Sequence, residues 1–106
     1  MEDQYLTVFC TFPDLESARR VIGRLVESKL IACGNLLAGA ESIYRWKGEI
    51  ERSSEVLAIL KTTSDKFPPL ESAFKELHPY ELPELIATQV SRGSQAYLSW
   101  ISENVS

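Results

Sequence analysis

The stretch Val56-Leu57-Ala58-Ile59-Leu60 is apolar at every position. Successive side chains of a strand point to opposite faces of a sheet, so a strand that is covered on one side alternates apolar with polar residues. This strand instead offers apolar side chains to both faces. The sequence therefore predicts a sheet whose second face is also covered, and self-association is the commonest way to cover it. The alternative is that the last helix or the long hairpin described below folds back over that face.

The segment Tyr5–Phe12 has the alternation of a second strand of this kind. One face carries Leu6, Val8, Cys10 and Phe12, and the other carries Tyr5, Thr7, Phe9 and Thr11. Asp14 follows this strand and can cap a helix whose apolar residues recur at helical spacing to about Lys29. A short buried strand is then predicted over Leu30–Leu37, in which Gly34 indicates a bulge or a close backbone approach.

A long hairpin follows the bend that is predicted at Gly39. Its first strand starts at Glu41, its turn is Lys47-Gly48-Glu49, and its second strand runs over Ile50–Thr63. The doubly apolar stretch therefore lies in the second strand of the hairpin.

A second helix begins near Ser64 and ends at His78, because Pro79 disfavours helical geometry in the residue before it. The remaining elements are a stiff connector to Pro83, a strand over Leu85–Val90 and a short helix capped by Ser94. This order of strands and helices matches the split βαβ, ferredoxin-like arrangement. We therefore expect one α/β domain of the α+β type over residues 1–106, with an antiparallel sheet, an extended hairpin and an extra C-terminal helix.

The composition is that of one globular domain: 106 residues, of which 44% are hydrophobic and 25% are charged. The net charge of −4 opposes binding to phosphate backbones and to anionic lipid. No apolar run approaches the roughly 18 residues of a membrane-spanning helix, and the acidic N-terminus does not resemble a signal peptide. We therefore expect a cytoplasmic protein without a nucleic-acid or membrane partner.

Few residues offer catalytic or metal-binding chemistry. The sequence contains no phosphate loop, dinucleotide glycine pattern, nucleophile elbow or pair of metal-binding histidines, so no catalytic residue is predicted. His78 is the only histidine, and Cys10 and Cys33 are expected to be free thiols that behave as buried apolar residues. A thiolate and an imidazole together suit copper or zinc, but two such donors fall short of a closed site.

Three aromatic residues, Tyr44, Trp46 and Trp100, are candidates for a ligand pocket or for packing. Aromatic side chains in hairpins and terminal helices are more often packing anchors than ligand contacts. We therefore predict that these three residues belong to a subunit interface or to the core. The hairpin around Trp46 is also longer than one small sheet can pair, which favours its contact with a second subunit.

Several separated motifs give the chain a resemblance to a known family. They are Cys10–Asp14 (CTFPD), Ser42–Glu49 (SIYRWKGE), Leu60–Thr63 (LKTT), His78–Glu84 (HPYELPE) and Ala96–Trp100 (AYLSW). With these motifs in this order, the chain resembles the CutA family of divalent-ion tolerance proteins. The resemblance implies a ferredoxin-like subunit, similar to the PII signalling proteins, that forms a homotrimer. It also implies a cytoplasmic role in tolerance of copper and other divalent metal ions.

The same resemblance implies a copper site. In bacterial relatives this site is assigned to the cysteine of the first strand and to two adjacent histidines, which correspond to Cys10, Leu77 and His78 here. A leucine side chain cannot coordinate a metal, so Cys10 and His78 are the only candidate ligands that remain. The chain therefore binds copper weakly, recruits a donor from another subunit or does not use this site, and of these alternatives we expect weak copper binding.

Four hypotheses on function result from these observations. The first is a trimeric protein that binds copper or a similar divalent cation in a response to metal ions. The second is a trimeric scaffold or PII-like signalling module that binds a small ligand or a protein partner between subunits. An enzyme and a metal-storage protein rank below them, because the candidate polar groups are better explained as solvated and because few thiols are present. Those candidate groups are Lys61, Glu49, Glu84 and Tyr80.

Overall fold

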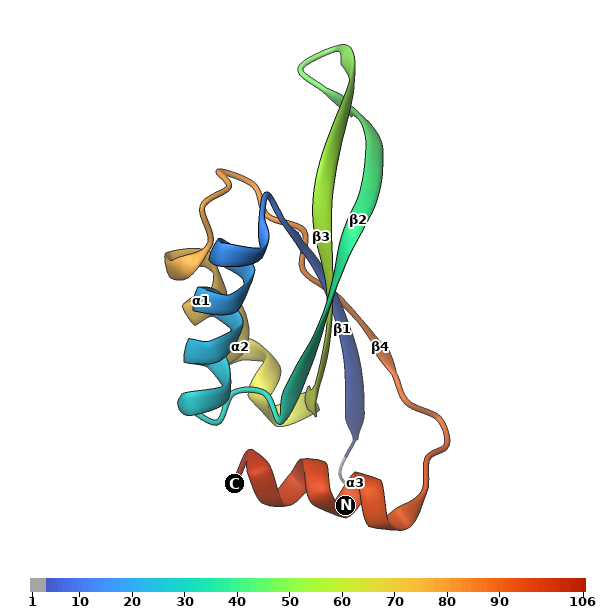
Figure 1. The fold of residues 1–106 in the computed structure, drawn as a ribbon. Helices are drawn as coiled ribbons and strands as arrows, with labels where there is room; N and C mark the ends of the chain where they lie inside the picture. Colours follow the sequence, from blue (N-terminus) through green and yellow to red (C-terminus); the bar gives the residue numbers. More distant parts are fainter. Residues whose placement is uncertain (1–3) are drawn as a thin grey trace.

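The structure is organised around the antiparallel pairing of β1 (Tyr5–Phe12) with β3 (Glu49–Thr63), in which Phe9 lies opposite Ile59. It is a computed structural model that describes residues 4–106 (Figure 1). The other elements are α1 (Leu15–Glu27), β2 (Cys33–Trp46), a 3₁₀ turn (Ser64–Lys66), α2 (Phe67–Leu77), β4 (Ile86–Gln89) and α3 (Gln95–Asn104). This order confirms the predicted succession of strands and helices.

The four strands form one antiparallel sheet in the order β2-β3-β1-β4. Helices α1 and α2 lie on the same side of the sheet, and α3 runs across one end of it (Figure 1). The predicted ferredoxin-like arrangement of the α+β type is therefore confirmed. Within residues 4–106, no helix combines the length and the apolar content needed to cross a membrane.

The predicted helix boundaries follow from local chemistry. Asp14 caps α1, because its carboxylate accepts a 2.7 Å hydrogen bond from the backbone N–H of Ser17. This hydrogen bonding lowers the pKa of the Asp14 carboxyl. Pro68 and Pro69 occupy the first turn of α2, where a missing N–H breaks no helical hydrogen bond. The helix ends at Leu77, and His78 already has extended backbone geometry, as expected before Pro79.

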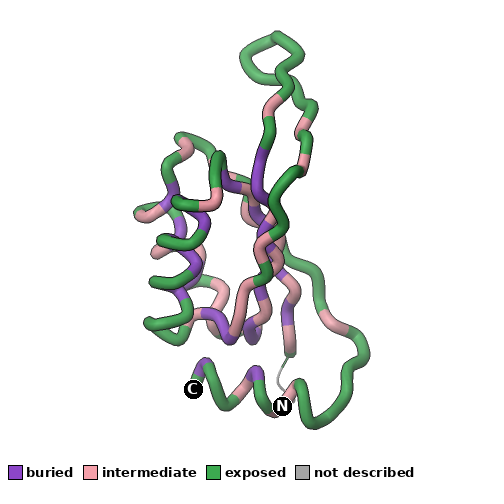
Figure 2. Tube along the Cα trace, in the orientation of Figure 1, coloured by how far each residue is buried: buried purple, intermediate pink, exposed green. Residues whose placement is uncertain are grey.

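The main core lies between the two helices and the inner face of the sheet, where the buried residues of Figure 2 gather. The inner face carries the predicted alternate residues of β1, and Val8 lies opposite Leu60 in the β1–β3 register. Helix α1 contributes Leu25 and helix α2 contributes Phe74, which are both fully buried. Phe12 and Phe74 meet edge to face, with their ring centroids 6.0 Å apart.

Strand β2 differs from its prediction. The sequence pattern predicted a separate short strand over Leu30–Leu37 and a hairpin strand from Glu41, but the two are one continuous strand over Cys33–Trp46. The register slips between Leu37 and Ala40, where a bulge absorbs one extra residue. Gly39 lies in this bulge with φ +87°, a conformation that side chains with a Cβ rarely adopt. A bulge at this glycine therefore bends the strand without ending it.

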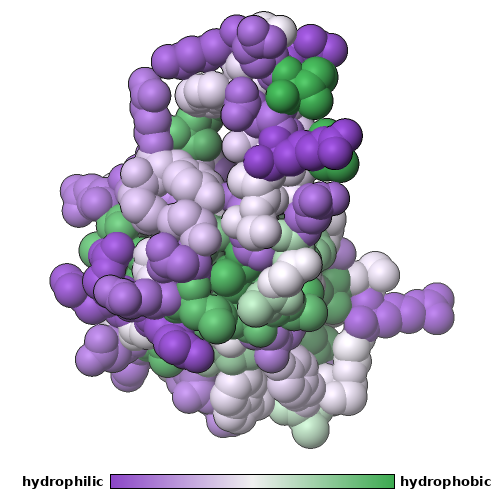
Figure 3. Space-filling view, turned by 45° about the horizontal axis from the view of Figure 1, so that its top comes forward, coloured by the Kyte–Doolittle hydropathy of each residue, from purple (hydrophilic) through white to green (hydrophobic). Residues whose placement is uncertain are grey.

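The outer face of the sheet carries the apolar side chains that the two-sided strand pattern predicted, but within the single chain it is only partly covered. Phe9, Leu57 and Ile59 are half-buried there, whereas Leu37 and Ile86 remain 47% and 58% exposed. Figure 3 shows hydrophobic side chains gathered below a hairpin that is mostly hydrophilic. This distribution leaves an apolar surface open beside the projecting hairpin in the single chain.

Helix α3 covers one end of the outer face. Its Ile101 and the following residue Val105 are buried against Ala32, and its Ser102 hydroxyl lies 2.7 Å from the Tyr5 hydroxyl. The alternative in which the last helix folds back is therefore correct for this end of the sheet. It does not hold for the end near Leu37, which α3 does not reach.

The close approach predicted at Gly34 provides a test of the packing. A Cβ at this position would meet the Ile22 side chain at 2.7 Å and the Leu60 side chain at 3.1 Å. Gly34→Ala should therefore lower the free energy of unfolding by about 1–3 kcal/mol, because it overpacks the core. Gly23→Ala is the control, since a Cβ there meets nothing within 4 Å and alanine favours the helix by about 1 kcal/mol. Urea unfolding at a fixed protein concentration measures both changes, and equal effects would contradict the packing.

Candidate functional site

Cys10, the first predicted metal ligand, lies in the middle of the inner sheet face. Its side chain is fully buried opposite Ala58 and belongs to the main hydrophobic core. Burial, with a smaller contribution from the charge of Glu84, raises the pKa of the thiol to about 12. The thiol is therefore protonated at neutral pH, whereas a metal ligand must be a thiolate.

His78, the second predicted ligand, is 6% exposed and uses both ring nitrogens in hydrogen bonds. Nε2 donates to the backbone carbonyl oxygen of Thr11 at 2.7 Å, and Nδ1 accepts from the backbone N–H of Tyr80 at 3.0 Å. This pairing fixes the neutral tautomer with its proton on Nε2. The imidazole also stacks on Phe12, with a centroid distance of 4.6 Å. Burial is the main reason why the pKa of His78 is lowered.

These two residues do not form an open copper site in this conformation. A copper ion needs the Cys10 thiolate and a free nitrogen of His78, and the packing supplies neither. Leu77, at the third position of the site that the family resemblance implies, packs against the main core. Across the part of the chain that the structure describes, no three His, Cys, Asp or Glu side chains form a group that could hold a metal ion.

A pocket of about 660 Å³ lies where the hairpin meets the connector between α2 and β4. The end of β1 supplies Thr11, the hairpin supplies Ser42, Ile43, Tyr44, Trp46 and Glu55, and the connector supplies Tyr80, Glu81, Leu82, Pro83 and Glu84. Its volume is within the range of sites for small molecules. The pocket is therefore a candidate for a ligand site.

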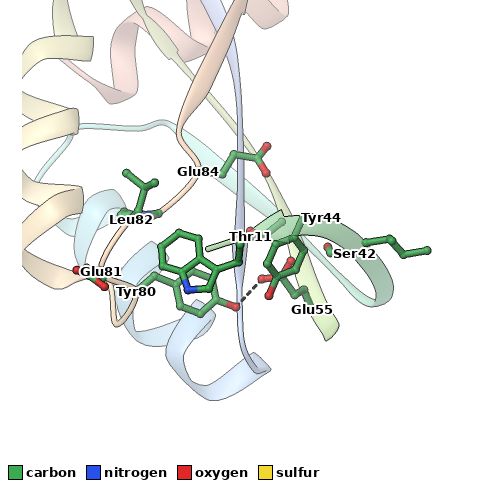
Figure 4. Close-up of a pocket in the computed structure, with 11 residues that line it drawn as sticks. Thr11, Ser42, Tyr44, Glu55, Tyr80, Glu81, Leu82 and Glu84 are labelled. Carbon is green, nitrogen blue, oxygen red and sulfur yellow. Dashed lines mark hydrogen bonds between the residues drawn. The ribbon is translucent and has the colours of Figure 1, made fainter. Parts of the chain in front are cut away.

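A partly buried hydrogen bond joins the two sides of this pocket. The Tyr80 hydroxyl donates to Oε2 of Glu55, and Figure 4 shows the ring of Tyr44 beside the same carboxylate. Burial and this hydrogen bond both raise the pKa of Tyr80, so its hydroxyl stays protonated. His78 supports the arrangement, because its Nδ1 accepts from the backbone of Tyr80 and its Nε2 donates to Thr11.

The predicted interface residues lie in two places. Tyr44 and Trp46 are on the hairpin and line the pocket. Trp100 is on α3 and stacks on Tyr97, with a centroid distance of 5.5 Å. The interface hypothesis for these three residues stays a prediction.

The structure also places Cys33 and the four polar residues that were named for an enzyme. Cys33 is a free thiol as predicted, but it is not in the core. Its sulfur lies on the outer face, 3.6 Å from the Tyr97 hydroxyl, because the strand starts one residue before the inward-facing Gly34. Of the groups named for an enzyme, Tyr80 and Glu84 line the pocket, whereas Lys61 and Glu49 do not. The Lys61 ammonium donates instead to the side-chain oxygen of Asn35.

Glu55 is a site residue that the sequence pattern did not predict. Glu55 immediately precedes the doubly apolar stretch, so it lies at the border of the buried region. A charged residue at this position is the feature of the sequence that could have indicated a site. Its partner Tyr80 is 25 residues away along the chain, and their pairing depends on how the connector folds back over the sheet.

Comparisons with known proteins give a consistent result. The sequence model of the family described as "CutA1 divalent ion tolerance protein" matches residues 6–104. A protein of Thermus thermophilus named divalent-cation tolerance protein CutA is 44% identical over 97 residues, which are 92% of this chain and 94% of the relative. The similarity therefore spans nearly the whole length of both chains.

Solved structures agree with the sequence matches. A divalent cation tolerance protein (Cut A1) from Thermus thermophilus superposes with a TM-score of 0.93 and 42% identity, covering 96% of this chain and 99% of the other. A periplasmic divalent cation tolerance protein CutA from Archaeoglobus fulgidus gives a TM-score of 0.93 with 37% identity, covering 96% and 99%. Identity at this level indicates a shared family as well as a shared fold.

The buried neutral state of His78 predicts how stability depends on pH. The folded chain resists protonation of His78, whereas the unfolded chain binds a proton below the ordinary pKa of about 6.5. The free energy of unfolding should therefore fall as the pH is lowered from 7.5 to 5.5, by at most about 1.4 kcal/mol per pH unit. Urea unfolding at both pH values measures this fall.

His78→Gln is the control for this prediction, because His78 is the only histidine of the chain. The variant should lose stability at pH 7.5 and should also lose the dependence on pH over this range. If the wild type and the variant show the same dependence, His78 is not kept neutral by the fold.

Proposed function

Because the chain belongs to the CutA1 family of divalent ion tolerance proteins, we propose that it acts in tolerance of divalent metal ions as a homotrimer. The observation that carries the metal-tolerance function is the match of the family model over residues 6–104, which covers nearly the whole fold. The family is named for tolerance and not for a catalysed reaction. We also propose a cytoplasmic location, although one relative is described as periplasmic.

The apolar outer face supports the trimer. Leaving apolar surface in water costs roughly 25 cal/mol per Å², so Leu37, Ile86 and their half-buried neighbours favour contact with another copy. The hairpin extends beyond the rest of the sheet and gives the chain its 45 Å length against 26 and 23 Å in the other two directions. We assign Tyr44 and Trp46 on this hairpin, and Trp100 on α3, to the contacts between subunits.

Copper binding by this chain is proposed to be weak. Coordination by Cys10 and His78 requires that the thiol lose its proton and that the imidazole give up a hydrogen bond to Thr11 or Tyr80. Both changes oppose the packing of the inner sheet face. The reduced ion, copper(I), is the better fit to a thiolate than copper(II). Tolerance through a tightly held copper ion on these residues is therefore not part of the proposal.

A trimeric scaffold or PII-like signalling module remains the second candidate function. The pocket at the base of the hairpin favours it, because a small ligand bound there would contact both the hairpin and the connector, which the hydrogen bond from Tyr80 to Glu55 already joins. In this role the chain binds a small molecule or a protein partner between subunits and has no metal of its own.

The assembly predicts the effect of single charges on its surface. Ile86→Asp places a carboxylate on the outer face and should reduce the native mass from trimer towards monomer. Trp46→Ala should also weaken the assembly if the hairpin lies between subunits, because it removes the contact area of the indole ring. Val26→Asp is the control, because Val26 is 41% exposed on α1 and lies on the other side of the sheet. Sedimentation equilibrium at micromolar concentration measures the masses.

Growth at raised copper concentration measures whether tolerance requires the assembly. In a strain that lacks the gene, the wild type and Val26→Asp should restore growth, and Ile86→Asp should restore it less. A wild-type monomer would contradict the trimer, and a strain that tolerates copper equally well without the gene would contradict the function.

The protonated thiol predicts how copper(I) binding responds to pH. Below a pKa of about 12, the thiolate fraction rises about tenfold per pH unit, and affinity through Cys10 should rise with it between pH 6.5 and 8.5. Binding should be lost in Cys10→Ser, reduced in His78→Ala and strengthened in Leu77→His. Cys33→Ser is the matched control and should bind like the wild type, because its thiol lies on the other face. Anaerobic calorimetric titration measures these affinities, and equal binding by Cys10→Ser would refute this site.

A further inference from the structure

The pocket at the base of the hairpin combines negative charge with aromatic surface. Three carboxylates line it, from Glu55, Glu81 and Glu84. No lysine, arginine or histidine is found among the lining residues that the structure describes. Arg20, a cation that acts on Asp14 and His78 nearby, does not line the pocket. A ligand of this pocket therefore meets a negative field, which repels anions and attracts cations.

Glu55 is the buried member of this set, with 9% of its surface exposed. Among residues 4–106, only the Tyr80 hydroxyl donates to its carboxylate, and it uses Oε2. In the same part of the chain, no solvent-excluded side-chain oxygen lacks a hydrogen-bond partner. The second oxygen, Oε1, is therefore not excluded from solvent, and Glu55 lines the pocket. A mostly buried carboxylate with one free oxygen is a strong acceptor for a charged donor.

Aromatic side chains form a second part of the lining. Tyr44, Trp46 and Tyr80 contribute their rings, and Figure 4 shows Tyr44 and Tyr80 on the two sides of the Glu55 carboxylate. The faces of such rings attract cations. The ammonium of Lys47 already lies 5.7 Å from the centroid of the Trp46 ring, although Lys47 does not line the pocket.

The rest of the lining distinguishes an organic cation from a metal ion. Ile43, Leu82 and Pro83 contribute carbon surface, which favours the apolar body of a ligand. Calcium and magnesium need six or more oxygen ligands, and the described residues contain no group of three metal-binding side chains. The pocket is also larger than a single ion requires, at about 660 Å³.

We propose that this pocket binds a small organic cation, in which an ammonium or guanidinium group is carried on an apolar body. The charged group lies at Oε1 of Glu55 and is further stabilised by the negative charge of Glu84. The apolar body lies among the aromatic rings and Leu82. This binding activity is independent of metal tolerance, and it uses neither Cys10 nor Leu77.

Benzylammonium and the neutral benzyl alcohol provide a matched pair of probes, because they share one apolar body and differ in charge. Calorimetric titration of the full chain at pH 7, in its native assembly, should show that benzylammonium binds about tenfold or more tightly than benzyl alcohol. The assembled protein is used because two of the lining residues, Tyr44 and Trp46, are also assigned to subunit contacts. Benzoate, the anion, should not bind.

Three variants locate the charge preference. Glu55→Gln keeps an oxygen that can accept from Tyr80 but removes the charge, and should lose most of the preference for benzylammonium. Glu84→Gln should reduce it, and this variant also keeps the test valid if Glu55→Gln does not fold. Glu103→Gln is the control, because Glu103 is exposed on α3 at the opposite end of the molecule. It should bind both probes like the wild type.

Four results would overturn the proposal. The first is an equal affinity for benzylammonium and benzyl alcohol, and the second is no binding of benzylammonium to the assembled wild type. The third is an unchanged preference for benzylammonium in both Glu55→Gln and Glu84→Gln. The fourth is displacement of benzylammonium by an equimolar amount of calcium. The second result would mean that another copy of the chain fills the pocket, and the last that it is a carboxylate metal site. None of these results depends on copper. They therefore test the organic-cation site alone, and the growth experiment tests metal tolerance.

Discussion

The pairing of β1 with β3 is the constraint on which the rest of the structure depends. Its register places apolar pairs on both faces of the central sheet, with Val8 and Leu60 on one face and Phe9 and Ile59 on the other. The first row is buried by α1 and α2, and α3 covers one end of the second. What remains exposed on the second face is therefore a direct result of the central pairing, and it is the basis of the proposed assembly.

The same pairing positions the pocket. It brings the end of β1 beside Glu55 at the point where the hairpin leaves the sheet. His78 then ties the connector to Thr11 through one ring nitrogen and orders Tyr80 through the other. A histidine that is the natural candidate for metal binding thus has a structural role, in which its neutral state is required.

Burial explains why the chemistry of this chain differs from the first interpretation of its residues. Cys10 is suited to metal binding by residue type, but its position opposite Ala58 makes it part of the core and keeps its thiol protonated. Glu55 lies at the border of the same core and retains an oxygen that faces the pocket. The charged group that is accessible to a ligand is therefore a carboxylate, which favours an organic cation in place of a copper ion.

The sequence by itself determined the order of the elements, the two-sided apolar strand and the family, because alternation, capping residues and prolines act over a few neighbouring residues. The continuity of β2 through the bulge at Gly39 was not predictable, since a glycine with positive φ allows either a bend that ends a strand or one that continues it. Only the tertiary structure decided which polar groups are accessible. The pairing of Glu55 with Tyr80 and the two hydrogen bonds of His78 join residues that are distant in sequence, and such contacts have no signature in a local pattern.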